Sequence, residues 1–137
     1  MSTRSIGRLG EDAACRYLEE NGYEIVARNV YAGSGEIDII ARDDRYLIFA
    51  EVKLRTVSAA QKRYGPPRDA VNYKKQTHLL SAVHAYLREH GRTLAPRIDV
   101  IEVLRTPLPD GSWELKIHHL KAAVSDRPDE SPNRSIY

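Results

Sequence analysis

Two short segments rich in β-branched residues, residues 36–42 and 46–54, are separated by little more than a pair of aspartates. Strands this close in the chain can pair only as an antiparallel hairpin, because a parallel connection needs a dozen or more residues. The hairpin therefore predicts two neighbouring strands of a β-sheet, against which the other helices and strands pack or pair.

Segments on either side of the hairpin predict helices and further strands. Apolar residues at helical spacing and a following glycine predict a helix over residues 6–21, and a second helix is expected over residues 69–90. Three more short β-branched or aromatic runs predict strands over residues 23–29, 98–104 and 113–120. This order, a helix, three strands, a helix and two strands, predicts an α/β fold with a mixed central sheet flanked by helices.

Length and composition narrow the class of protein. The 137 residues suit a single domain, which we expect over residues 1–124, with a polar, proline-containing, disordered tail over residues 125–137. The chain has 21 Lys and Arg against 19 Asp and Glu, a net charge of +2, so any nucleic-acid role depends on local charge placement. No apolar run approaches the roughly 18 residues of a membrane span. The N-terminus lacks a signal-peptide pattern, so we expect a cytoplasmic protein.

Cysteine and histidine usage exclude further classes of site. The single cysteine, Cys15, rules out a disulfide framework. It lies off the apolar stripe of the first helix, so we expect an ordinary surface or interface thiol. Histidines on the second helix are spaced by six residues, which scatters them around its axis. His118 and His119 are adjacent on a strand and point to opposite faces. We therefore expect no metal site built from histidine or cysteine.

Acidic side chains gather on one face of the central hairpin. Glu36 and Asp38 share a face on the first strand, and Glu51 and Lys53 share a face on the second. If residues 43–44 alone form the turn, Glu36 falls opposite Glu51 and Asp38 is its diagonal neighbour. A bulge or a longer turn would instead bring Asp38 directly opposite Glu51. In either register two or three carboxylates meet.

Like charges placed opposite each other destabilise a hairpin, and Lys53 alone cannot neutralise three carboxylates. A divalent cation could, and hard oxygen ligands suit Mg²⁺ or Mn²⁺. Lys53 would then lie beside the metal, where it could orient or deprotonate a water that attacks a phosphodiester. The alternative is a solvated charge pair, which Glu-x-Lys on a strand often is. The apolar neighbours of Asp38 and Glu51 favour the site instead.

The same residues carry a resemblance. The run Gly35-Glu-Ile-Asp38 followed by Phe49-Ala-Glu-Val-Lys53 resembles the PD-(D/E)XK nuclease signature, although Ile37 occupies the place of its proline. Over most of residues 7–123 the chain is identified as a member of the bacterial YraN family. That family is similar to archaeal Holliday-junction resolvases of the restriction-endonuclease-like superfamily. The stretches that carry this resemblance are GRLGEDAACRYLEENGYEIVARN, GEIDIIARDDRYLIFAEVKLRT, YGPPRDAVNYKKQTHLLSAVHAYL, RIDVIEV and IHHLKAA.

The resemblance implies a restriction-endonuclease-like αβββαβ core and Mg²⁺- or Mn²⁺-dependent cleavage of DNA, with branched or damaged DNA as candidate substrates and 5′-phosphate ends. It implies that Asp38 and Glu51 bind the metal and that Lys53 activates the water or stabilises the transition state. Glu11 sits where resolvase-like nucleases carry a helical acidic residue near the metal, although the helix dipole alone would also favour it. Glu36 precedes Asp38 by two positions and faces the same way, so we expect it to be a further metal ligand or to bind a neighbouring backbone group or cation.

Basic residues follow the acidic hairpin. Seven of them lie between positions 53 and 75, opposed only by Asp69. A basic loop beside a metal site is what a phosphate backbone requires, whereas the alternative is a solvated loop and helix face. The nucleic-acid contacts we predict are Arg55, Lys62, Arg63, Lys75 and Gln76. The alternative function is a nuclease-fold module that binds nucleic acid without cutting it. An exposed sheet edge and the hairpin at Trp113 are compatible with a homodimer.

Overall fold

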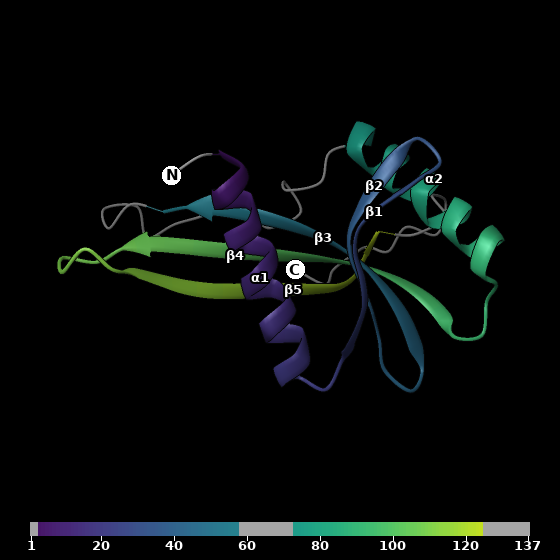
Figure 1. Ribbon diagram of the computed structural model, residues 1–137, viewed down its shortest axis with the longest axis horizontal. Coiled ribbons are helices and arrows are strands. Elements are labelled where there is room, and N and C mark those ends of the chain that lie inside the picture. The colour runs from purple at the N-terminus through teal and green to yellow at the C-terminus, as the bar shows by residue number, and fades with distance from the viewer. Residues whose placement is uncertain (1–2, 58–72, 125–137) are drawn as a thin grey trace.

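The computed structural model describes residues 3–57 and 73–124, which form a five-stranded sheet and two helices (Figure 1). The elements are α1 (Thr3–Glu20), β1 (Glu24–Ala32), β2 (Gly35–Arg42), β3 (Tyr46–Thr56), α2 (Tyr73–His90), β4 (Ala95–Pro107) and β5 (Trp113–Val124). Each predicted element is present and in the predicted order. The fold is therefore α/β with a mixed sheet, consistent with a restriction-endonuclease-like core.

The strands lie in the sheet in the order β1-β2-β3-β4-β5. The first three form an antiparallel meander, β3 and β4 pair in parallel, and β5 returns antiparallel to β4. The parallel step is possible because α2 lies in the connection between β3 and β4, as crossover connections require. The tail predicted over residues 125–137 lies outside the described residues. No helix in the described ranges is long and apolar enough to span a membrane.

The two helices cover opposite faces of the sheet (Figure 1). Leu79, Val83 and Leu87 of α2 pack on one face, whose core includes Phe49. On the other face the apolar side of α1 packs on β2, β3 and β4. Alternation of side chains along each strand thus supplies two cores from one sheet, because both faces are covered.

Cys15 belongs to the core under α1, so the expectation of a surface or interface thiol is wrong. The residue is 8% exposed and packs with Ala14 and Leu18 against the sheet. The helix packs across several strands, so the side of α1 that is buried is wider than its apolar stripe and includes Cys15. Burial raises the pKa of the Cys15 thiol, as expected for a structural cysteine.

The turn of the central hairpin is longer than two residues. The Asp43 amide donates to the carbonyl of Tyr46 at 3.1 Å, and the Asp43 carboxylate accepts from the amides of Arg45 and Tyr46 at 2.8 and 2.7 Å. The strands consequently pair with Arg42 opposite Leu47. The register that a two-residue turn would impose is therefore wrong. The longer turn holds because the Asp43 side chain satisfies two amides within it.

Candidate functional site

The predicted acidic residues line one pocket of about 310 Å³. It opens at the end of the β2–β3 pairing, between the first turns of α1 and the early part of α2. The residues that line it are Gly7, Glu11, Glu36, Asp38, Glu51, Val52, Leu54, His78 and Leu79. All four carboxylates predicted as metal ligands, two of them 40 positions apart in the sequence, are thus brought to one place.

Asp38 lies where β2 and β3 separate. The β2–β3 ladder ends at the pair Ile39–Ala50, so the next position of each strand places Asp38 against Glu51. The strands no longer bond each other there, and the Asp38 carboxylate accepts the amide of Val52 at 2.8 Å instead. The register that the sequence left as the alternative is therefore the one that forms.

Electrostatics at this position are unfavourable for a bare carboxylate. Burial and the neighbouring Glu51 raise the pKa of Asp38 from 3.8 to about 7, and Glu11 and Glu36 add to the rise. The amide of Val52 opposes the shift but does not cancel it. Glu51 itself is only 6% exposed. A group that resists ionisation because of burial and like charges is one that a cation would stabilise in its charged form.

The donor set fits a hard divalent cation. Among residues 3–57 and 73–124, no three His, Cys, Asp or Glu side chains stand close enough to form a ready-made metal shell. Mg²⁺ does not require one, because it keeps several waters and is commonly bound through one or two carboxylates. Asp38 and Glu51 supply two carboxylates at one opening, so the residues present fit Mg²⁺ or Mn²⁺.

Glu11 reaches the pocket from α1 but also has a cationic partner. The Arg28 guanidinium lies 3.5 Å from the Glu11 carboxylate and 2.8 Å from that of Asp12. Arg28 therefore offsets part of the negative charge at the α1 side of the pocket. Glu36 remains near the exposed Tyr31, whose pKa it raises by its charge and a side-chain hydrogen bond.

Of the predicted basic residues, the structure describes the side chains of Lys53 and Arg55, and neither lines the pocket. Lys53 is half-buried on the same face as Glu51, one pleat further along β3, and is not among the lining residues. Arg55 lies one pleat further again and forms an ion pair with Glu102 of β4 at 2.9 Å. Lys62 and Arg63 lie outside the described residues. Lys75 and Gln76 belong to the first turn of α2, and their side chains also lie outside the described part.

His78 is a pocket residue that the sequence analysis missed. Its Nδ1 lies 3.4 Å from the hydroxyl of Ser34, which donates to the hydroxyl of Ser81 at 3.0 Å. The turn between β1 and β2 docks closely here, because a Cβ at Gly35 would collide with the main-chain carbonyl of His78. Gly35 is the sequence feature that could have pointed to this contact, because a glycine allows the turn to pack closely against α2.

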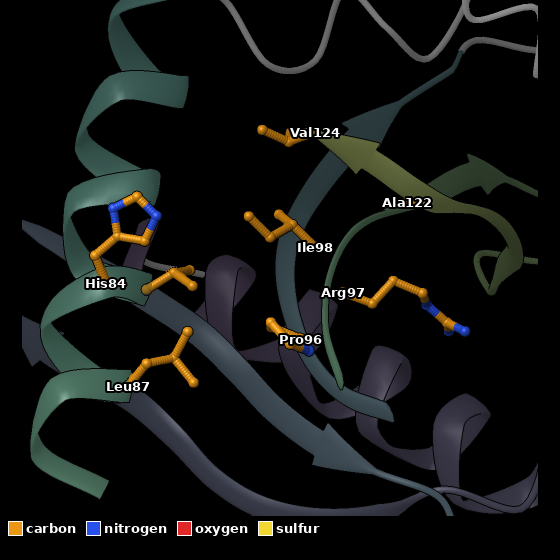
Figure 2. Close-up of a pocket in the computed structure, with 8 residues that line it drawn as sticks. His84, Leu87, Pro96, Arg97, Ile98, Ala122 and Val124 are labelled. Atoms are coloured by element: carbon orange, nitrogen blue, oxygen red, sulfur yellow. The ribbon is translucent and has the colours of Figure 1, made fainter. Parts of the chain in front are cut away.

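A second cavity, of about 100 Å³, lies at the other end of α2 (Figure 2). Figure 2 shows His84 and Leu87 facing Ile98 and Val124 across it, while the side chain of Arg97 leads away. Its walls are mostly apolar and include none of the predicted site residues. The acidic pocket therefore remains the candidate site.

A buried polar network on the α1 face explains where Arg97 goes. Asp99 is fully buried and accepts from Arg97 at 2.9 and 3.0 Å, from His119 at 2.7 Å and from the amide of Ala122 at 3.0 Å. Burial alone would raise the pKa of Asp99, but these hydrogen bonds outweigh it and hold the pKa below its usual value. Tyr17 on α1 bonds the other nitrogen of His119 at 2.9 Å. The network joins α1 to β4 and β5 and is structural.

Comparisons with known proteins give one consistent result. The model of the family described as "Uncharacterised protein family UPF0102" matches residues 10–103. A UPF0102 protein of Symbiobacterium thermophilum is 46% identical over 116 residues, which are 84% of this chain and 93% of that protein. One of Syntrophotalea carbinolica is 45% identical over 102 residues, 74% of this chain and 80% of the relative. One of Arthrobacter is 40% identical over 117 residues, 85% and 92% of the two chains.

Proposed function

This chain belongs to the uncharacterised protein family UPF0102, the YraN family, and from that premise we propose that it is a metal-dependent endonuclease that hydrolyses DNA phosphodiesters. The observation that carries the proposal is the juxtaposition of Asp38 and Glu51 at the end of the β2–β3 pairing. Two carboxylates forced together in a pocket, one with its pKa raised to about 7, are stabilised by a divalent cation.

The residues divide into ligands and supporting groups. Asp38 and Glu51 would hold Mg²⁺ or Mn²⁺, with Glu36 and Glu11 at the rim of the same pocket. When bound, the metal would lower the pKa of a water and offset the negative charge of the phosphate. The amide of Val52 keeps the Asp38 carboxylate oriented through its 2.8 Å hydrogen bond, so that one oxygen is fixed before any ligand arrives.

Lys53 completes the proposed chemistry from the neighbouring pleat of β3. Its ammonium would orient the attacking water or offset the charge that develops on the phosphate oxygens. Water adds to phosphorus, the bond from phosphorus to O3′ breaks, and O3′ takes up a proton. The products are a 5′-phosphate and a 3′-hydroxyl. Arg55, Lys62, Arg63, Lys75 and Gln76 are the proposed contacts to the nucleic acid, in a cytoplasmic enzyme that can act as a homodimer.

A second candidate is a nuclease-fold module that binds nucleic acid without cutting it. The position of Lys53 outside the pocket lining and the pairing of Glu11 with Arg28 favour this alternative. In that case the acidic pocket would hold a cation, and no turnover would follow.

A cleavage panel separates the two functions. Linear duplex, single-stranded, nicked, flap and four-way-junction DNA would each be incubated with Mg²⁺, Mn²⁺ or EDTA. We expect metal-dependent cutting that Asp38→Ala and Lys53→Ala abolish, while the exposed turn residue Asp44, changed to Asn, leaves it intact. Labelled ends should carry 5′-phosphate. Binding without cutting on every substrate would contradict the endonuclease and favour the binding module.

A further inference from the structure

The sheet face that carries Glu51 continues past α2 onto β4 and β5, where cationic side chains surround a buried glutamate. The strand registers place Lys53 beside Glu102, and Glu102 beside His118. One pleat further, a second row follows the same three strands: Arg55, Leu104 and Lys116. We call these two rows the β3–β5 patch.

The patch lies on the face of the acidic pocket. Glu51 is paired with Val100, which belongs to the α2 core, and side chains two positions further along each strand return to that face. Strands lie about 4.8 Å apart and alternate residues about 6.6 Å apart, so the patch extends roughly 10 Å across the sheet. It begins one pleat from the carboxylates of the pocket.

An ion pair within the patch holds one of its cations, Arg55, in place. Arg55 donates to the Glu102 carboxylate at 2.9 Å, yet its side chain is still 34% exposed, whereas Glu102 is fully buried. Nδ1 of His118 lies 3.6 Å from the second oxygen of Glu102, which no hydrogen-bond donor of the described residues reaches. A buried carboxylate is costly unless it is paired, so the ion pair holds Arg55 at Glu102 while about a third of the Arg55 side chain stays exposed.

The net positive charge of the β3–β5 patch favours a negatively charged ligand. Lys53, Arg55 and Lys116 carry three positive charges, and Lys116 is exposed on the edge strand β5. The single negative group, Glu102, lies beneath them with no exposed surface. Besides the exposed Lys116 on β5, Arg55 and Lys53 are partly exposed on β3. Cations spaced across the sheet in this way match repeated phosphates, which protein cations contact without reading sequence.

We propose that the β3–β5 patch binds the phosphates of duplex DNA on one side of the cut, so that the substrate runs from the acidic pocket across β3, β4 and β5. Glu102 is the positioning residue that holds Arg55 in place for a phosphate. The proposal rests on the proposed function for its choice of DNA, and it adds β5, where no contact was expected from the sequence.

The test is duplex-DNA binding in EDTA, where no metal-dependent cleavage interferes. Fluorescence anisotropy of a labelled duplex would be measured from 50 to 200 mM salt for the wild type, Lys116→Ala and Lys121→Ala. Lys121 is an exposed lysine of the same strand that lies outside the two rows, which makes it the matched control. Loss of one phosphate contact lowers the slope of log K against log salt by about one. The ratio of wild-type to Lys116→Ala affinity should then be about 3–4-fold larger at 50 mM than at 200 mM salt.

The role of Glu102 has its own readout. Glu102→Gln should weaken binding as Arg55→Gln does, and the double variant should bind no more weakly than Arg55→Gln alone. Additive losses would contradict positioning through Arg55. Equal salt slopes for Lys116→Ala, Lys121→Ala and wild type would overturn the patch, as would a wild type that does not bind duplex DNA.

The outcomes separate the two proposals. Binding that depends on Lys116 without any cleavage by the wild type keeps the patch and removes the endonuclease. Cleavage that is insensitive to Lys116, with an unchanged salt slope, keeps the endonuclease and removes the patch.

Discussion

Replacing Asp38 by Asn should stabilise the metal-free protein at neutral and alkaline pH. The pKa of Asp38 rises from 3.8 to about 7 on folding, because the carboxyl is buried beside Glu51. The folded state therefore binds more protons than the unfolded state between these values, and stability falls as pH rises through that window. Asn keeps an oxygen for the amide of Val52 but carries no charge.

The size of the stability change follows from the difference between the pKa values of Asp38 in the unfolded and the folded state. A rise of roughly three pKa units corresponds to about 4 kcal/mol lost above pH 7, and to less than about 1 kcal/mol at pH 4. For a chain of this size, Asp38→Asn should raise Tm by roughly 10 °C or more at pH 8 and hardly at all at pH 4. Mg²⁺ or Mn²⁺ should stabilise the wild type at pH 8, by about 2.7 kcal/mol at one hundred times Kd, and should not stabilise the variant.

Thermal unfolding at pH 4, 6 and 8, with and without metal, measures both effects. The exposed turn residue Asp44, changed to Asn, is the matched control and should behave as wild type. A variant that is less stable than wild type at pH 8, or one equally stabilised at pH 4 and pH 8, would refute the electrostatic reasoning. Equal stabilisation of both proteins by metal would refute the assignment of Asp38 as a ligand.

Three further predictions concern the scaffold. Asp99→Asn should cost about 3–5 kcal/mol in urea unfolding at pH 7. Because its pKa is lowered on folding, the cost should shrink as pH falls below 4, and a constant difference would be inconsistent with this reasoning. Gly35→Ala should lower stability by about 1–3 kcal/mol through collision with the carbonyl of His78, whereas Gly7→Ala, with open space around it, should be neutral or stabilising. Equal effects would contradict the docking of the turn. Cys15 should react with a thiol reagent only at the rate of unfolding, and fast labelling of the native protein would contradict its burial.

Much of the fold could be predicted because the strands and helices are marked by strong local patterns. The β-branched runs and the glycine after the first helix place the elements to within a few residues. β4 and β5 extend beyond their predicted ends, to 13 and 12 residues. β4 is longer by three residues at each end, and β5 is longer by four residues at its C-terminal end. These added residues are held in the sheet by backbone pairing with neighbouring strands, which an apolar pattern does not detect.

The register at the site could not be decided from the sequence. It depends on whether the turn after Arg42 has two or four residues, and that depends on hydrogen bonds that the Asp43 side chain makes within the turn. The same shift by two positions decides whether Glu36 or Asp38 faces Glu51. The sequence therefore predicts that these carboxylates meet on one face, but it leaves open which of them faces Glu51.

Contacts between residues on different strands could not be predicted from the sequence, for a different reason. Glu102 and His118 meet Arg55 only because β4 lies between β3 and β5, and strand order leaves no trace in periodicity. The opposite orientations predicted for His118 and His119 are confirmed, since one faces Glu102 and the other Asp99. The alternation of side chains along a strand predicts which face of the sheet each residue occupies. The strand order is needed to identify the residues of neighbouring strands that it contacts.

The most direct test of the endonuclease is single-turnover cleavage with enzyme in excess over a labelled four-way junction and its component duplex, in Mg²⁺ or Mn²⁺ at pH 8. The account predicts cleavage by the wild type and by Asp44→Asn, with rates at least about a hundredfold lower for Asp38→Asn and Glu51→Gln. A wild type that binds both DNAs and cuts neither would contradict it, as would cleavage that both carboxylate variants retain.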